Sequence, residues 1–366
     1  MEFINLKAQY TAYKDEIDGA VQRVCANAAF IMGGEVADLE SSLAKYTGAA
    51  HAISCSSGTD ALVLALMALG IGCGDEVITS PFTFIATAEA IALVGATTVF
   101  ADIDLSDCNI YAALIERAIT PKTKAIMPVS LYGQCADMDT INAIAARHNL
   151  AVIEDGCQSF GALYRGKKSG NVSTIGTTSF FPSKPLGCYG DGGAIFTSDN
   201  ELAARLAMLR NHGQSARYEH KVVGINGRLD AIQAAILNVK LRHFDAELSR
   251  RAELRTRYDR LLAKGGVTVV GEGAKSVTAQ YSVRVKHRDR VAALLNAKGV
   301  PTAVHYPKPL HLQEAFAALG YARGDFPLSE QAADEVLSLP FSPFLTEAEQ
   351  DTVANALDEA IKEAAC

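Results

Sequence analysis

Three short segments of the chain combine reactive or polar residue types with surroundings that would hold them in place. The first is Ser56-Ser57-Gly58-Thr59-Asp60, which precedes an apolar helical run. Backbone N–H groups at the start of a helix can bind a phosphate, although Ser and Thr also cap ordinary helices. The segment is not a Walker loop, because no Gly-Lys-Ser/Thr follows it. It therefore predicts either a phosphate site or a plain helix start.

The second segment carries an acid, Asp155, directly after the apolar run 150–153. Ligands of parallel sheets bind where strands end at their carboxyl edge, so we expect Asp155 to face a cleft. An acid in that place could be a general base, a metal ligand or the partner of a cationic ring nitrogen. The alternative is an aspartate that only caps a loop.

The third segment carries Lys184. Pro182 and Pro185 exclude a regular helix around it, aromatic residues precede it, and the glycine-rich run 190–193 follows. Most lysines are solvated surface charges. A lysine held in an apolar, tightly shaped pocket loses its charge more easily and can form an imine with an aldehyde.

Together the segments offer a phosphate site, an acid for a pyridinium nitrogen and an imine-forming lysine. These are the three protein parts that pyridoxal phosphate requires. The eight cysteines form no Cys-x-x-Cys pair and stand at no His spacing suited to zinc, so no metal site is expected.

The scaffold that must position these segments is predicted by the alternation of short apolar runs with helical ones between about residues 50 and 200. Strands followed by helices indicate an α/β fold with a mostly parallel sheet covered on both faces. The expected strands are 52–55, 77–79, 98–101, 125–129, 150–153, 175–180 and 193–196, and the expected helices 60–69, 86–93, 113–118 and 140–148.

A long helix is expected from Leu229 to Tyr258, and a segment with a different residue pattern begins at Gly265-Gly266. We expect a large domain at 1–244, with about residues 1–20 free to pack elsewhere, and a smaller α+β domain at 245–366. Its expected elements are the strand-like runs 281–285 and 302–304 and the helices 288–297 and 347–363.

Composition narrows the classes of function. The 366 residues suit two or three domains, and 49% of them are hydrophobic, which is enough for a sizeable core. A net charge of -7 without a basic run argues against nucleic acid and anionic membranes. No apolar stretch approaches the roughly 20 residues of a membrane span, and the first residues do not resemble a signal peptide. We expect a cytoplasmic protein with reduced cysteines.

Over nearly its whole length the sequence resembles the DegT/DnrJ/EryC1/StrS family of sugar aminotransferases, which have the aspartate-aminotransferase fold (fold type I). The resemblance is carried by Phe3-Ile4-Asn5-Leu6, Ser57-Gly58-Thr59-Asp60-Ala61-Leu62, Glu154-Asp155-Gly156-Cys157-Gln158, Ser183-Lys184, Gly190-Asp191-Gly192-Gly193, Gly224-Ile225-Asn226-Gly227-Arg228-Leu229-Asp230 and His305-Tyr306.

The resemblance implies roles for the catalytic pair. Lys184 would bind pyridoxal phosphate covalently and move the proton, with pyridoxamine phosphate formed during the cycle. Asp155 would keep the ring nitrogen protonated. Relatives that are sugar dehydratases have His in place of the lysine, and the presence of Lys184 therefore favours amino transfer.

The resemblance also implies the cofactor contacts. Phe84 would stack on the ring, with Phe82 as the alternative, and Gln158 would reach the 3-oxygen. Asn226 would reach the phosphate in the partner subunit's site, which implies a homodimer. The phosphate would be held by Gly58, Thr59 and Ser179.

The sugar is implied by similarity alone. The runs 130–137 and 179–193 look closest to the branch that aminates C3 of UDP-2-acetamido-2-deoxy-3-oxo-D-glucuronate with L-glutamate, for surface polysaccharides of the O-antigen type. The alternative is a 4-keto or 3-keto deoxy-sugar on UDP or dTDP. His305 and Tyr306 would lie at the sugar-nucleotide pocket. Arg228 is either a surface salt-bridge former or a substrate contact, and Arg228, Lys308 or His305 could bind a glucuronate carboxylate.

Overall fold

The protein is built around a large sheet whose two faces are both covered by helices. The computed structural model describes residues 1–263, 267–271 and 276–365. The sheet has seven strands in the order β1-β9-β8-β5-β4-β2-β3, and β9 runs antiparallel to the other six. The strands are β1 (His51–Cys55), β2 (Glu76–Thr79), β3 (Thr97–Phe100), β4 (Thr123–Ile126), β5 (Ala151–Asp155), β8 (Ile175–Ser179) and β9 (Gly193–Thr197). All seven expected strands are therefore present.

The strands alternate their side chains between two cores, as the pleat of a sheet requires. In β5, Ile153 lies in one core and Val152 in the opposite one. The first core is covered by α3 (Gly58–Ala68), α4 (Ala86–Leu93) and α7 (Asn200–Leu209). The opposite face is covered by α2 (Gly34–Thr47), α5 (Ala112–Ala118), α6 (Met138–His148) and α8 (Ala231–Leu262).

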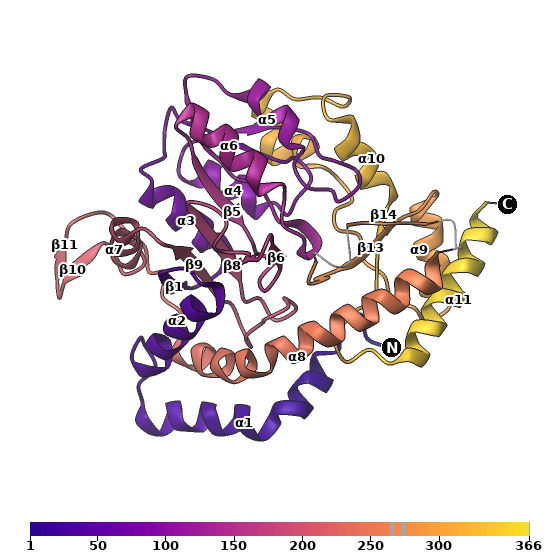
Figure 1. Ribbon diagram of the computed structural model, residues 1–366, viewed down its shortest axis with the longest axis horizontal. Coiled ribbons are helices and arrows are strands. Elements are labelled where there is room, and N and C mark those ends of the chain that lie inside the picture. The colour runs from indigo at the N-terminus through magenta and orange to yellow at the C-terminus, as the bar shows by residue number, and fades with distance from the viewer. Residues whose placement is uncertain (264–266, 272–275, 366) are drawn as a thin grey trace.

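A second, smaller sheet lies toward the C-terminal end of the chain (Figure 1). It consists of β12 (Thr268–Val269), β13 (Tyr281–Arg284) and β14 (Val336–Leu339), all antiparallel. The helices α9 (Arg288–Ala297) and α11 (Glu347–Ala364) pack on it around a separate core, and α10 (Pro327–Glu335) leads into β14. The expected strand at 302–304 is absent, because only Ala303 forms a bridge, to Ser338.

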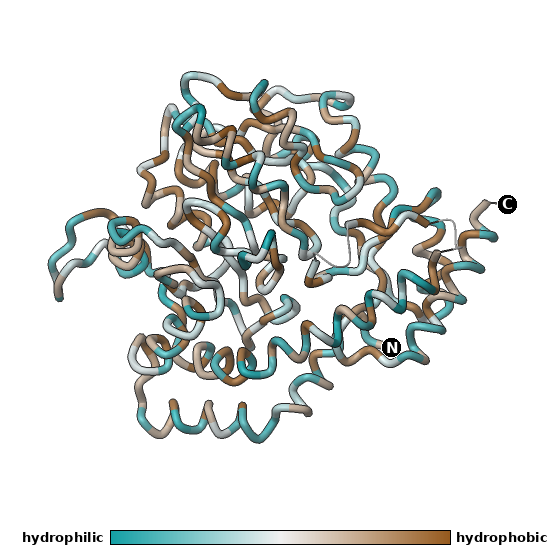
Figure 2. The backbone as a smooth tube through the Cα atoms, viewed as in Figure 1, coloured by the Kyte–Doolittle hydropathy of each residue, from teal (hydrophilic) through white to brown (hydrophobic). Residues whose placement is uncertain are grey.

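The helix α8 connects the two cores. Its first half packs on α1 (Leu6–Asn27) and α2, and its last turns enter the small core through Leu254, Tyr258 and Leu262. In Figure 2 the long helices α1 and α8 mix hydrophilic and hydrophobic residues along their length, as expected for helices with one buried face. The expected domain boundary after residue 244 falls inside α8 and stays a prediction, and Gly265-Gly266 lie outside the described residues.

A small hairpin leaves the body of the protein at the left of Figure 1. It is formed by β10 (Gln214–Ala216) and β11 (Glu219–His220), and the two-residue β6 (Leu163–Tyr164) and β7 (Lys167–Lys168) make a further short pair. Tyr218 at the hairpin tip and the neighbouring Val223 are 79% and 88% exposed. No helix in the described part of the chain could cross a bilayer, and the seven cysteines that the structure describes are all free.

Candidate active site

The three segments singled out in the sequence meet at the carboxyl edge of the large sheet. A Cβ added to Gly58 would lie 2.7 Å from Cβ of Ser179 and 2.9 Å from Sγ of Cys157. The start of α3, the end of β8 and the segment after Asp155 are therefore in direct contact. Only glycine fits at position 58, which is the first residue of α3.

The phosphate candidate is a well-formed helix start. Ser57 caps α3 by accepting a hydrogen bond from the backbone N–H of Asp60 at 3.0 Å, and the Asp60 carboxylate in turn accepts from Ser56 at 2.5 Å. The backbone N–H of Ser56 donates to the carbonyl of Gly227. The cap interpretation is thus correct, and it is compatible with phosphate binding because Gly58 and Thr59 lie in the first turn, where N–H groups have no intrahelical acceptor.

Asp155 ends β5 and is 5% exposed. One carboxylate oxygen accepts a hydrogen bond from the hydroxyl of Thr87 at 2.7 Å, and the other accepts from the backbone N–H of Cys157 at 3.2 Å. Thr87 lies in the first turn of α4, and its oxygen is 3.2 Å from the hydroxyl of Thr83. Because Thr87 gives its only proton to Asp155, the proton between the two threonines belongs to Thr83.

The metal-ligand alternative for Asp155 finds no support in the structure. Within residues 1–263, 267–271 and 276–365, no three His, Cys, Asp or Glu side chains gather where they could hold an ion. The buried Asp155 carboxylate is instead held by hydrogen bonds from a hydroxyl and a backbone amide.

Lys184 lies in a tight loop between β8 and β9. The backbone N–H of Cys188 closes the loop on the carbonyl of Phe180 at 2.7 Å, and Lys184 N–H donates to Phe181 at 2.8 Å. A Cβ on Gly187 would lie 2.5 Å from the carbonyl oxygen of Pro182, so the loop leaves room only for glycine there. From α8, the buried Lys240 donates to the Gly187 carbonyl.

Lys184 is electrostatically coupled to the other segments. Burial and, to a smaller extent, the charge of Lys184 together lower the pKa of His305 to about 4. Burial raises the pKa of the Cys157 thiol, an effect that the charge of Asp155 increases and that of Lys184 opposes. Lys184 therefore lies within electrostatic range of both Cys157 and His305.

Gln158 is hydrogen-bonded to two tyrosines that lie far from it in the sequence. Its Oε1 accepts from the backbone N–H of Tyr132 at 2.8 Å, and its Nε2 donates to the hydroxyl of Tyr306 at 3.2 Å. Phe84 is 53% exposed with its ring 6.0 Å from that of Tyr306, whereas Phe82 is buried in the core. Of the two rings, Phe84 is the exposed one.

The remaining expected residues differ in their surroundings. His305 contacts Ser338 Oγ through Nδ1 at 2.9 Å, and Lys308 is exposed. Arg228 donates to Asn211 Oδ1 at 2.7 Å, while its buried Nε has no hydrogen-bond partner. Asn226 is exposed and pairs with Asn211 across an isolated bridge. Arg228 makes no ion pair among the described residues, so the surface salt-bridge interpretation is not supported.

Sequence reasoning overlooked three residues that support the site, namely Thr87, Tyr132 and Lys240. The spacing of Thr83 and Thr87, i and i+4 across the start of an apolar helix, was a usable signal for Thr87, because this spacing places both hydroxyls on one side. Tyr132 and Lys240 act through contacts with residues distant in sequence, which no local pattern reveals.

The sequence and the fold both have close relatives. A UDP-2-acetamido-2-deoxy-3-oxo-D-glucuronate aminotransferase of Pseudomonas aeruginosa is 52% identical over 359 residues, 98% of this chain and 99% of the relative. A dTDP-3-amino-3,4,6-trideoxy-alpha-D-glucose transaminase of Streptomyces venezuelae is 42% identical over 98% of this chain and 95% of its own.

Solved structures agree. The crystal structure of DesV from S. venezuelae superposes with a TM-score of 0.95 and 42% identity, over 98% of this chain and 97% of that one. NtdA from Bacillus subtilis, solved with bound cofactor PMP, has a TM-score of 0.91 and 34% identity over 96% and 82%. Residues 11–358 match the family described as DegT/DnrJ/EryC1/StrS aminotransferases. The resemblance seen in the sequence is confirmed, and this chain belongs to the DegT/DnrJ/EryC1/StrS aminotransferase family.

Proposed function

We propose that the protein transfers an amino group from L-glutamate to the 3-keto carbon of UDP-2-acetamido-2-deoxy-3-oxo-D-glucuronate, using pyridoxal phosphate. The observation that carries the reaction type is the meeting of Lys184, Asp155 and the Gly58 helix start in one site. The 52% identity to an aminotransferase named for this sugar supports the substrate. The product would serve surface polysaccharides of the O-antigen type, made in the cytoplasm.

The residues present fit pyridoxal phosphate. Gly58 has no Cβ, which lets the first turn of α3 approach Ser179 closely, so that the N–H groups of this turn and the Ser179 hydroxyl could bind one phosphate. Asp155 would hold the ring nitrogen and Gln158 the 3-oxygen, with Phe84 on the ring face and the phosphate held by Gly58, Thr59 and Ser179. When bound, the cofactor supplies an electron-accepting ring beside the carbon that exchanges its amino group.

The chain's own groups then have three tasks. Nζ of Lys184 takes the proton from the α-carbon of glutamate in the first half-reaction and returns a proton to C3 of the sugar in the second. The Asp155 carboxylate, held by Thr87 and by Cys157 N–H, stabilises a positive charge at the ring nitrogen. The closed loop around Lys184 holds the backbone of this residue in one place through both halves.

The site must also recognise the sugar's carboxylate. With a pKa of about 4, His305 is neutral near pH 7 and supplies a hydrogen bond instead of a positive charge. The cations available are therefore Lys308, which is exposed, and Arg228, whose Nε lacks an acceptor. The second candidate, a 3-keto or 4-keto deoxy-sugar on UDP or dTDP, is supported by the named activity of the S. venezuelae relative. Its sugar ring carries no carboxylate for these cations to bind.

We also propose a homodimer with shared sites. Exposed apolar side chains support it: Phe30, Ile31, Phe181, Tyr218 and Val223 are each at least 45% exposed. Asn226 is itself exposed and follows the hairpin that leaves the body of the protein (Figure 1). In the dimer Asn226 would reach the phosphate of the partner subunit's site.

The test is the visible spectrum of the cofactor-loaded protein mixed with UDP-2-acetamido-3-amino-2,3-dideoxy-glucuronate. Loss of the visible cofactor band on mixing is expected, because the amino sugar gives its nitrogen to the cofactor in the reverse direction. A matched sugar without the carboxylate should act far more weakly, and Lys308→Met should reduce this difference. If the band changes only with 4-amino or deoxy sugars, the second candidate is correct, and if no band forms with added pyridoxal phosphate, the enzyme assignment fails.

A further inference from the structure

Tyr132 is a fully enclosed residue whose three polar groups each bind a different segment of the protein. It lies in the short helical turn η1 (Leu131–Gly133) that follows β4, and it is 4% exposed. Its backbone N–H donates to Oε1 of Gln158, its carbonyl accepts from Ala279 N–H at 3.0 Å, and its hydroxyl donates to the carbonyl of His305. No expected role in the reaction uses these contacts.

The first contact fixes the direction of the Gln158 amide. A backbone N–H can only donate, so Oε1 must face Tyr132 and the NH2 group must face the other way. One of the two Nε2 protons goes to the hydroxyl of Tyr306. The other is left for the 3-oxygen that Gln158 is expected to reach.

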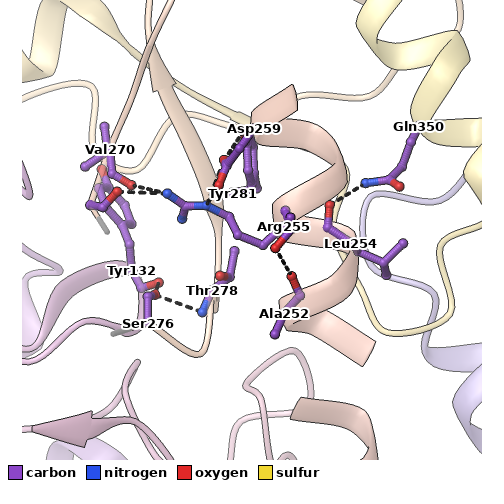
Figure 3. Close-up of polar contacts among 12 residues, drawn as sticks. Tyr132, Ala252, Leu254, Arg255, Asp259, Val270, Ser276, Thr278, Tyr281 and Gln350 are labelled. Carbon is purple, nitrogen blue, oxygen red and sulfur yellow. Dashed lines mark hydrogen bonds and ion pairs between the residues drawn. The ribbon is translucent and has the colours of Figure 1, made fainter. Parts of the chain in front are cut away.

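The other two contacts bind Tyr132 to the small sheet's side of the protein. Figure 3 shows Tyr132 beside Ser276 and Thr278, in the segment that leads into β13. The approach is close, since a Cβ on Gly133 would lie 2.8 Å from the backbone nitrogen of Ala279. The hydroxyl then reaches His305, the residue before Tyr306.

These contacts form a closed circuit: Tyr132 holds Gln158 and His305, and Tyr306, the neighbour of His305, holds Gln158. We infer that Tyr132 is a positioning residue that sets the segment 302–308 against the cofactor-facing amide of Gln158, so that sugar binding depends on its hydroxyl. The inference rests on the proposed function, in which His305 and Tyr306 face the sugar nucleotide.

The test compares Tyr132→Phe with Tyr258→Phe in the cofactor-loaded protein. Tyr258 is the matched control, because it is also fully buried and also donates its hydroxyl to a backbone carbonyl, that of Pro340 at 3.1 Å, inside the small core. Loss of a buried hydrogen bond is expected to raise KM for the sugar about tenfold in Tyr132→Phe only. The kcat and the cofactor dissociation constant should stay within about twofold of wild type, since the N–H contact to Gln158 remains.

A second readout does not depend on turnover. Amide hydrogen exchange in 302–308 should rise in Tyr132→Phe and in Tyr306→Phe, and the double variant should add little, because both changes open the same circuit. If Tyr132→Phe matches Tyr258→Phe in both KM and exchange, the inference is wrong. If the wild-type protein does not use the UDP-sugar at all, the proposed function fails, while the exchange comparison still decides the role of Tyr132.

Discussion

Removal of the Thr87 hydroxyl tests how the site holds its acid. Thr87→Val keeps the shape of a fully buried side chain and deletes the 2.7 Å hydrogen bond to Asp155. A hydrogen bond to a charged group contributes about 1.5–3 kcal/mol, and 1.36 kcal/mol corresponds to tenfold in rate. We therefore expect kcat to fall by roughly 10- to 100-fold, with the larger value as the limit because the Cys157 N–H contact survives.

The assay is steady-state amino transfer with ordinary and α-deuterated glutamate. If Asp155 is weakened, proton transfer becomes slower, so the isotope effect on kcat should increase in Thr87→Val. Thr87→Ser restores the hydroxyl and should recover most of the rate. Thr79→Val is the matched control, because Thr79 is equally buried but donates to the carbonyl of Met127. Equal rates in Thr87→Val and Thr79→Val would refute the reasoning.

Three further predictions concern the lysine, the glycine and a buried histidine. Lys184→Ala should bind cofactor and glutamate without turnover, and borohydride should no longer fix the cofactor to the chain; normal turnover would remove Lys184 from the mechanism. Gly58→Ala should weaken cofactor binding at least about tenfold in a spectrophotometric titration, because the new Cβ would lie 2.7 Å from Cβ of Ser179. Gly19→Ala is the control, because its Cβ would lie 3.8 Å from the nearest atom, and it should leave cofactor binding unchanged. Equal cofactor dissociation constants in the two variants would contradict the phosphate site. The pKa of His305 is about 4, below the roughly 6.5 of an unfolded chain, so the unfolded state takes up the proton first and stability falls as pH drops from 6.5 to 4. His305→Gln should make the melting temperature depend less on pH in that range. The same pH dependence in the wild type and the variant would show that His305 does not titrate in this way.

The sheet was predictable because each of its strands has a recognisable local sequence pattern. The run before Asp155 is apolar on both faces, as expected of a strand covered by helices on each side, and the seven strands all appear. The helix α1 was not expected, because its buried residues Ile17, Ala20 and Val24 are few and stand among charged ones. Their burial depends on α8, which lies far along the chain.

The site was predictable to the extent that its residues follow strands or open helices. Lys184, Asp155 and Gly58 each stand at such a junction, and the structure brings their segments together. Local sequence does not reveal side-chain partners that are distant along the chain. For Arg228 the sequence allowed a surface ion pair, and only the structure reveals its hydrogen bond to Asn211. The full burial of Glu154 was also not predictable from local sequence. Its carboxylate accepts hydrogen bonds from the hydroxyls of Ser130 and Ser169 and from the N–H of Gly170, which all lie outside its own strand.

The packing of α1 on α8 has a consequence for how the chain acquires its structure during synthesis. The apolar face of α1 is buried by Ala231, Ala235, Ile236 and Val239. At a ribosomal speed of ~5–20 residues per second, about 10 to 40 s pass between Asn27 and Ala231 leaving the ribosome. A helix made first thus waits for a partner made late, and during that interval Ile17 and Val24 are open to chaperones and proteases.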